Sequence, residues 1–181
     1  TKMNPNLNYG QTIPGHRKGL GRGTGMIDTY CFVEMLDALT LLDSSKAMTP
    51  AIKKGMKEWF TQFVEWIQTS PVAEENAAKN NHGLAYDVQL TAYALYIGNK
   101  ELATQILKAF PEKRLFPQIE PDGKQPLELE RTTAFGYTLF NLTHMLDMSF
   151  IASTEGIDIY NATSKDGRSI TAALKFVIPY I

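Results

Sequence analysis

The chain has 181 residues, of which 44% are hydrophobic and 20% are charged, a balance that is ordinary for a globular domain. Eighteen basic and nineteen acidic side chains give a formal net charge of -1. A global basic field that would hold nucleic acid nonspecifically is therefore excluded, and an anionic ligand must be bound by local groups. No apolar run approaches the roughly 20 residues of a membrane span. The single cysteine, Cys31, cannot form an internal disulfide.

The two ends of the chain predict an internal segment of a longer domain. Residues 1–6 resemble a loop within a protein, with no signal peptide. Residues 176–181 end on apolar side chains without a polar tail. We therefore expect residues 1–181 to form one domain segment.

The first half of the chain predicts a loop followed by two helices. Residues 1–25 are rich in Asn, Gly and Pro, which favours a loop. Apolar residues then recur every three or four positions and predict an amphipathic helix from Met26 to Leu42, in which Cys31 is expected to be buried. A second helix is predicted from Thr49-Pro50, a threonine cap followed by proline, to Ser70-Pro71.

The second half predicts four more helices. No segment shows the alternation of apolar and polar residues that is typical of a strand. Their expected ranges are Leu84 to Ile97, Lys100 to Phe110, about Thr132 to Phe150 and about Ile170 to Ile178. Short connections indicate antiparallel helical hairpins. No repeat fixes the period of a linear solenoid, so the sequence predicts an all-α fold, an incomplete α/α toroid or barrel.

Two polar runs supply groups for chemistry next to a carboxylate. Residues 79–83, Lys-Asn-Asn-His-Gly, place two amides and an imidazole before the third predicted helix. Residues 130–137 place Arg131 and Tyr137 six positions apart. Amide and guanidinium donors can neutralise a carboxylate, and histidine and tyrosine can transfer protons.

Four runs, in this order along the chain, carry a resemblance to a known family. They are Gly21-Arg22-Gly23-Thr24-Gly25-Met26-Ile27-Asp28-Thr29; Asn80-Asn81-His82-Gly83-x-x-Tyr86-Asp87-Val88-Gln89; Gln118-Ile119-Glu120-Pro121-Asp122-Gly123-x-Gln125-Pro126-Leu127-Glu128-Leu129-x-Arg131-Thr132; and Tyr137-x-x-Phe140-Asn141-Leu142. Together they resemble the alginate lyase family of polysaccharide lyases. The family's domain is considerably longer than this chain.

The resemblance implies an α/α toroid whose cleft binds a uronic acid polymer and cleaves it by β-elimination. The three scattered histidines have no nearby carboxylates at the spacing of a metal site, so no metal or other cofactor is expected. The resemblance places Asn81, His82, Arg131 and Tyr137 at the family's catalytic positions. Five further residues are expected to bind substrate in the cleft: Asn80, Arg22, His16, Tyr86 and Gln125. All of these except His16 and Gln125 also have a structural alternative, such as a helix cap, a loop ion pair or a place in the core.

The chemistry leaves the roles of two residues open. If the C5 proton and the leaving oxygen lie on one face of the sugar, as in mannuronate or glucuronate, Tyr137 can serve as base and acid. If they lie on opposite faces, as in guluronate, His82 is the base and Tyr137 the acid.

Two alternatives belong to other functional classes. A glycoside hydrolase on a similar toroid needs two carboxylates, for which Asp28, Asp87 and Glu120 are the candidates. A noncatalytic saccharide-binding segment is the other. A lyase that degrades a polymer is expected in the periplasm or outside the cell.

Overall fold

The computed structural model describes residues 3–181 and contains helices, turns and loops, with no strand in that range. The expected all-α class is confirmed. By the density of backbone contacts, the chain forms two compact units. The first comprises residues up to 76 and residues 89–103, and the second comprises residues 77–88 and 104–181.

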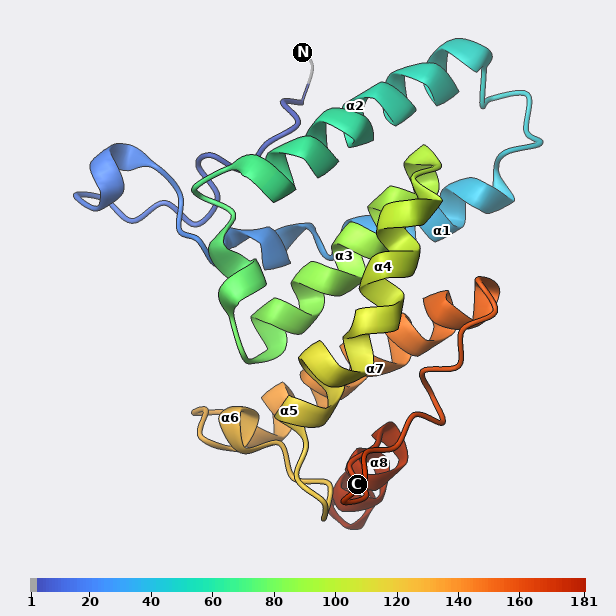
Figure 1. Cartoon of the computed structure of the whole chain (residues 1–181). Helices are drawn as coiled ribbons and strands as arrows, with labels where there is room; N and C mark the ends of the chain where they lie inside the picture. The colour runs from blue at the N-terminus through green and yellow to red at the C-terminus, as the bar shows by residue number, and fades with distance from the viewer. Residues whose placement is uncertain (1–2) are drawn as a thin grey trace. The chain divides into compact units, whose positions relative to one another are not determined.

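The first unit contains two whole helices and parts of two others. α1 spans Cys31–Leu41 and α2 spans Pro50–Thr69 (Figure 1). Residues 89–97 of α3, which spans Asn81–Ile97, and the first residues of α4, Lys100–Phe110, also belong to this unit. Short 3-10 turns at Arg17–Gly19, Gly25–Thr29 and Glu74–Ala77 shape the loops.

Aromatic side chains from α2 and α3 form the core of the first unit. Phe60 and Phe63 are buried, and their rings lie 5.2 Å and 5.7 Å from that of Tyr93. Thr49 caps α2 as predicted, because its hydroxyl accepts a hydrogen bond from the Ile52 amide.

The first predicted helix needs two corrections. Residues 25–29 form a 3-10 turn, and the α-helix begins only at Cys31. Cys31 is exposed, so the prediction that it is buried is wrong. Cys31 is not on the face of α1 that packs into the core, because Leu36 is the residue of this helix that is buried.

The second unit is built around α7, Ala134–Thr154, which is contacted by α6, Pro126–Leu129, and by α8, Ile170–Val177. α4, Lys100–Phe110, ends at its predicted residue, but a π-helical turn at Pro111–Leu115 and the short α5, Phe116–Gln118, continue its path. A last 3-10 turn covers Ile178–Tyr180.

The caps of the second unit agree only in part with the prediction. α8 begins at its predicted residue, Ile170, directly after Ser169, which caps it by accepting a hydrogen bond from the Ala172 amide. α6 was not predicted. α3 begins at Asn81, three residues before its predicted start, so that Asn81 and His82 lie in the first helical turn and not in a loop.

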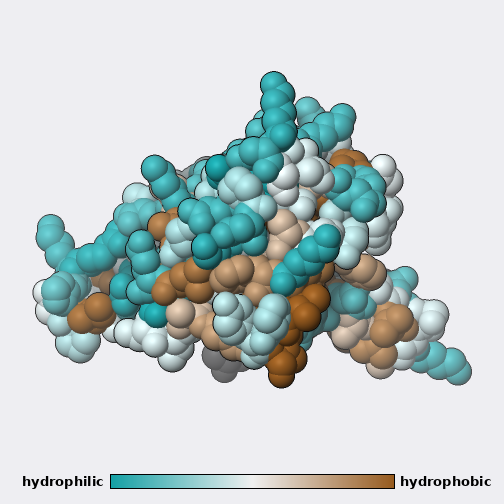
Figure 2. All heavy atoms as spheres, turned by 90° about the horizontal axis from the view of Figure 1, so that it is seen from below, coloured by the Kyte–Doolittle hydropathy of each residue, from teal (hydrophilic) through white to brown (hydrophobic). Residues whose placement is uncertain are grey.

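Polar and apolar side chains both reach the surface. On the face drawn in Figure 2, hydrophobic side chains gather near the middle, between hydrophilic ones. Within residues 3–181, no helix combines the length and the apolar character that a membrane crossing requires.

Candidate active site

The first turn of α3 is tied to a buried carboxylate from α6. Glu128 Oε1 accepts a hydrogen bond from the Asn81 backbone amide at 2.8 Å, and Oε2 accepts one from Asn81 Nδ2 at 2.7 Å. Glu128 is 1% exposed and Asn81 is 0% exposed. The carboxylate thus satisfies one of the amides that a helix N-terminus leaves without a partner, and it lies where the helix dipole favours negative charge.

Asn80 is the capping residue of the same turn. Its side-chain oxygen accepts a hydrogen bond from the His82 amide at 3.2 Å, and its carbonyl accepts one from Gly83 at 3.0 Å. This geometry is typical of an N-cap asparagine. Asn80 therefore has the structural role that the sequence left open, and its contact with substrate stays a prediction.

A buried ion pair also supports this turn. Arg114 Nε lies 2.8 Å from Asp87 Oδ2, and Arg114 Nη1 donates a hydrogen bond to the Ala78 carbonyl at 2.8 Å. A Cβ atom at Gly83 would collide with that carbonyl and with the Arg114 guanidinium. Glycine at position 83 is therefore what permits residues 78–83 to pack this closely.

Arg131 and Tyr137 lie against each other. The Arg131 guanidinium carbon is 4.0 Å from the centroid of the Tyr137 ring, a cation–π geometry. Both residues are half-buried. Tyr137 stands in the first turn of α7, where its amide donates to the Thr133 carbonyl. The Arg131 amide donates to the carbonyl of Glu128, so the residue that binds Asn81 also contacts Arg131.

His82 lies in the first turn of α3. It is half-buried, and its charge contributes to the low pKa of His144, which lies seven residues beyond Tyr137. Burial is the larger cause, and together the two effects lower the pKa of His144 to about 3. His144 is 0% exposed and is therefore a residue of the core.

The four residues predicted as catalytic all lie in the second unit, and contacts of Glu128 and Arg131 link three of them. Arg114 and Glu128 were not recognised as parts of this arrangement. Their partners lie 27 and 47 residues away in the sequence, so no local pattern could have revealed them.

Two of the residues expected to line the cleft are buried instead. Tyr86 is 4% exposed, and burial together with the neighbouring Asp87 carboxylate raises its pKa to about 12. Gln125 is 1% exposed and uses both ends of its amide internally, accepting from Asn141 at 2.8 Å and donating to the Thr138 carbonyl at 3.3 Å. The structure thus gives both residues internal contacts, and their expected contact with substrate stays a prediction.

His16 and Arg22 are exposed loop residues of the first unit. The Arg22 amide donates to the Gly10 carbonyl, which holds the glycine-rich loop together. The expected contact of either side chain with substrate stays a prediction.

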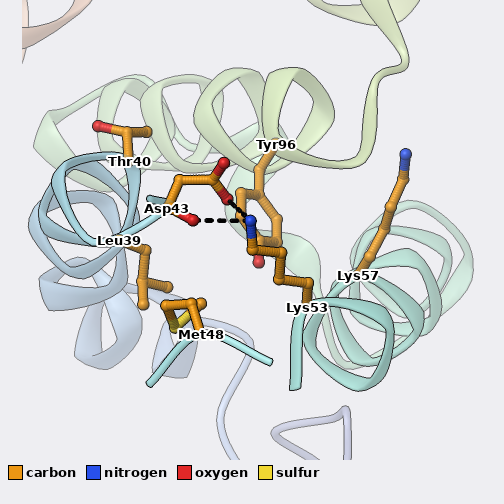
Figure 3. A pocket seen from close by; sticks show the side chains of 7 residues that line it. All are labelled: Leu39, Thr40, Asp43, Met48, Lys53, Lys57 and Tyr96. Carbon is orange, nitrogen blue, oxygen red and sulfur yellow. Dashed lines mark hydrogen bonds and ion pairs between the residues drawn. The ribbon is translucent and has the colours of Figure 1, made fainter. Parts of the chain in front are cut away.

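A pocket of about 450 Å³ in the first unit contains none of the predicted site residues (Figure 3). Its lining includes Asp43, Lys53 and Tyr96. Lys53 Nζ lies 2.6 Å from Asp43 Oδ1 and also donates to the Asp43 carbonyl at 2.8 Å, so this cation of the pocket is already neutralised. Lys53 is therefore not a ready carboxylate-binding group.

The hydrolase alternative loses a candidate. Asp87 is 1% exposed and forms ion pairs with Arg114 and, at 3.2 Å, with Lys113. A carboxylate held in this way is not available to protonate a glycosidic oxygen or activate water.

The comparisons with known proteins agree with the resemblance seen in the sequence. The chain is similar to an alginate lyase from Bacteroides ovatus of known crystal structure, with 77% sequence identity and a TM-score of 0.98. This match covers 100% of the chain and 48% of the other, so the chain spans about half the length of that protein. Comparison with curated proteins gives no match. The alginate lyase family itself is matched over residues 1–181, and the chain therefore belongs to the alginate lyase family.

Proposed function

We propose that the protein is a polysaccharide lyase that cleaves alginate or a related polyuronate by β-elimination. The observation that carries the proposal is the contact between Arg131 and Tyr137, 4.0 Å from guanidinium carbon to ring centroid, in a chain of the alginate lyase family. It puts a carboxylate-binding cation beside a group that can transfer a proton.

The reaction removes the C5 proton of a uronate, forms the C4–C5 double bond and breaks the bond from C4 to the bridging oxygen. Its barrier is high because the developing enolate concentrates negative charge beside an ionised carboxylate. Fixed donors aimed at that charge lower the barrier. Arg131 supplies a permanent cation, and Asn81 keeps one Nδ2 hydrogen beyond the one it gives to Glu128.

Tyr137 is the proposed proton carrier. For substrates whose C5 proton and leaving oxygen lie on one face, it takes the proton from C5 and returns one to the bridging oxygen. For substrates with the two on opposite faces, His82 takes the proton and Tyr137 protonates the leaving oxygen. Whether His82 or Tyr137 is the base thus depends on the stereochemistry of the substrate.

The experiment is incubation of the protein with polymannuronate, polyguluronate and polyglucuronate, followed by ultraviolet absorbance of the unsaturated product. Tyr137→Phe should lower kcat by about 10²- to 10⁴-fold, the usual contribution of a general acid or base. Tyr160→Phe, a change at an exposed tyrosine, serves as the matched control and should keep wild-type kcat. No unsaturated product from any of the three polymers would refute the proposal.

A second comparison tests the division of roles. His82→Asn should slow cleavage of polyguluronate more than cleavage of polymannuronate, since only the former uses His82 as the base. Equal loss on both polymers would contradict this assignment. Because a lyase that degrades a polymer is expected to be exported, we also propose that the enzyme acts in the periplasm or outside the cell, which fractionation of the producing cells would test.

A further inference from the structure

Glu128 is the residue in which the two halves of the candidate site meet. Its carboxylate binds Asn81 twice, through the backbone amide and through Nδ2. Its backbone carbonyl accepts the hydrogen bond of the Arg131 amide at 3.2 Å. Glu128 is near Arg131 in the sequence, whereas Asn81 lies 47 residues before Glu128 and is brought to it only by the fold.

The position of Glu128 is itself fixed. Its amide donates to the Gln125 carbonyl at 3.0 Å, and α6, which carries it, packs against α7. Its side chain is 1% exposed, and a buried carboxylate is tolerated only where hydrogen bonds compensate for lost hydration. The two donors of Asn81 provide this compensation, so the contact has little freedom to rearrange.

A carboxylate also determines which way the Asn81 amide faces. An ionised carboxylate only accepts hydrogen bonds, so it must be met by the NH₂ group of Asn81 and not by its oxygen. Asn81 Oδ1 has no hydrogen-bond partner among residues 3–181. With one Nδ2 hydrogen bound to Glu128, the direction of the second is set by the planar amide.

We propose that Glu128 is a positioning residue for the elimination reaction. It fixes the orientation of the Asn81 amide through its carboxylate and the start of the Arg131 segment through its carbonyl. The two groups that bind the substrate carboxylate are thereby presented as one preorganised unit. The inference rests on the proposed function, because it assigns Glu128 a role in that reaction.

The first test is Glu128→Gln in the full chain. Glutamine has the same shape, but with its oxygen on the Asn81 backbone amide its NH₂ group faces the Asn81 side chain. The Asn81 amide then either meets it donor to donor or turns over to accept with Oδ1, and in both cases Nδ2 loses the orientation that the carboxylate imposes. We expect kcat on the preferred polyuronate to fall by about 10- to 100-fold with a smaller change in KM, because the misplaced donors matter most as charge develops. Glu130→Gln, a change at an exposed neighbour, is the matched control and should keep both constants.

The second test separates positioning from folding. In the double variant Asn81→Asp with Glu128→Gln, the glutamine oxygen accepts from the backbone amide of residue 81 and its NH₂ group donates to the introduced aspartate. The polarity of the contact is reversed, but both hydrogen bonds are restored. We expect the melting temperature to return toward the wild-type value while kcat stays low, because the carboxylate introduced at position 81 repels the substrate carboxylate.

The outcomes are distinct. If wild type forms no unsaturated product from any polyuronate, the proposed function fails and the inference fails with it. If wild type is active and Glu128→Gln retains its kcat, the inference alone is overturned. It is also overturned if kcat per folded molecule recovers in the double variant, since Glu128 then serves only to hold the fold.

Discussion

The buried imidazole of His144 makes the stability of the protein dependent on pH in a predictable direction. Burial, and to a smaller extent the charge of His82, lower its pKa from the ordinary 6.5 to about 3. Between these two values the unfolded chain takes up a proton that the folded protein does not. The free energy of unfolding therefore falls as pH drops below 6.5, and the contribution of neutral His144 is complete above that pH.

The size of the effect follows from the two pKa values. Linkage gives a loss of about 2 kcal/mol on going from about pH 7.5 to about pH 5, and a total of about 5 kcal/mol once both forms are protonated. A loss of about 2 kcal/mol is a large share of the stability of an ordinary domain. It is measurable from urea unfolding at a series of pH values.

The assay compares pH profiles and not absolute stabilities, because His144→Gln also changes packing. Wild type should lose about 2 kcal/mol more than His144→Gln over the same pH interval. His16→Gln, a change at an exposed histidine, should follow the wild-type profile. Parallel profiles for wild type and His144→Gln would refute the reasoning, since the buried imidazole would then carry no linkage.

Three further predictions concern the support of the α3 turn and the helix caps. Asp87→Asn and Arg114→Met should each destabilise the fold by about 3–5 kcal/mol, because each leaves a buried partner uncompensated. The double variant should lose much less stability than the sum of the two single losses. Additive losses in urea unfolding would contradict this coupling. Gly83→Ala should cost about 1–3 kcal/mol through collision with its neighbours. Gly55→Ala, in open space within α2, should instead stabilise by about 0.5–1 kcal/mol. In thermal unfolding, the melting temperature should therefore fall for Gly83→Ala and rise for Gly55→Ala. Ser169→Ala should cost about 1 kcal/mol by removing the cap of α8, and an unchanged melting temperature would contradict its role.

Helices set by local signals were predicted well from the sequence. α2 has its predicted bounds because Thr49 and Pro50 mark its start, and α8 follows the cap at Ser169. α4 likewise begins after Asn99, whose side chain accepts from the Leu102 amide. In each case the deciding interaction lies within four residues, so the sequence pattern contains it.

The structure also contains contacts with distant residues that the sequence could not reveal. α3 begins at Asn81, directly after the cap that Asn80 forms, and Glu128 in addition accepts the Asn81 amide, a partner that no pattern near residue 81 contains. Gln125 was expected to line the cleft, and the structure places its amide in contact with Asn141 and Thr138, 16 and 13 residues away in the sequence. Polar residue type alone does not separate a ligand contact from a buried network.

The pattern of buried charge around residues 78–83 is hard to explain by stability alone. A buried ion pair such as Asp87 with Arg114 is often no more stabilising than apolar residues of the same volume. A core selected only for stability has no need of it, nor of the buried carboxylate of Glu128 at the same turn. Hydrogen bonds to the Ala78 carbonyl and to Asn81 have a property that apolar contacts lack, because they fix direction as well as distance. Such directional control is useful only if residues 81 and 82 must face a particular point, which is the demand that a fixed carboxylate and an adjacent C5 proton would impose.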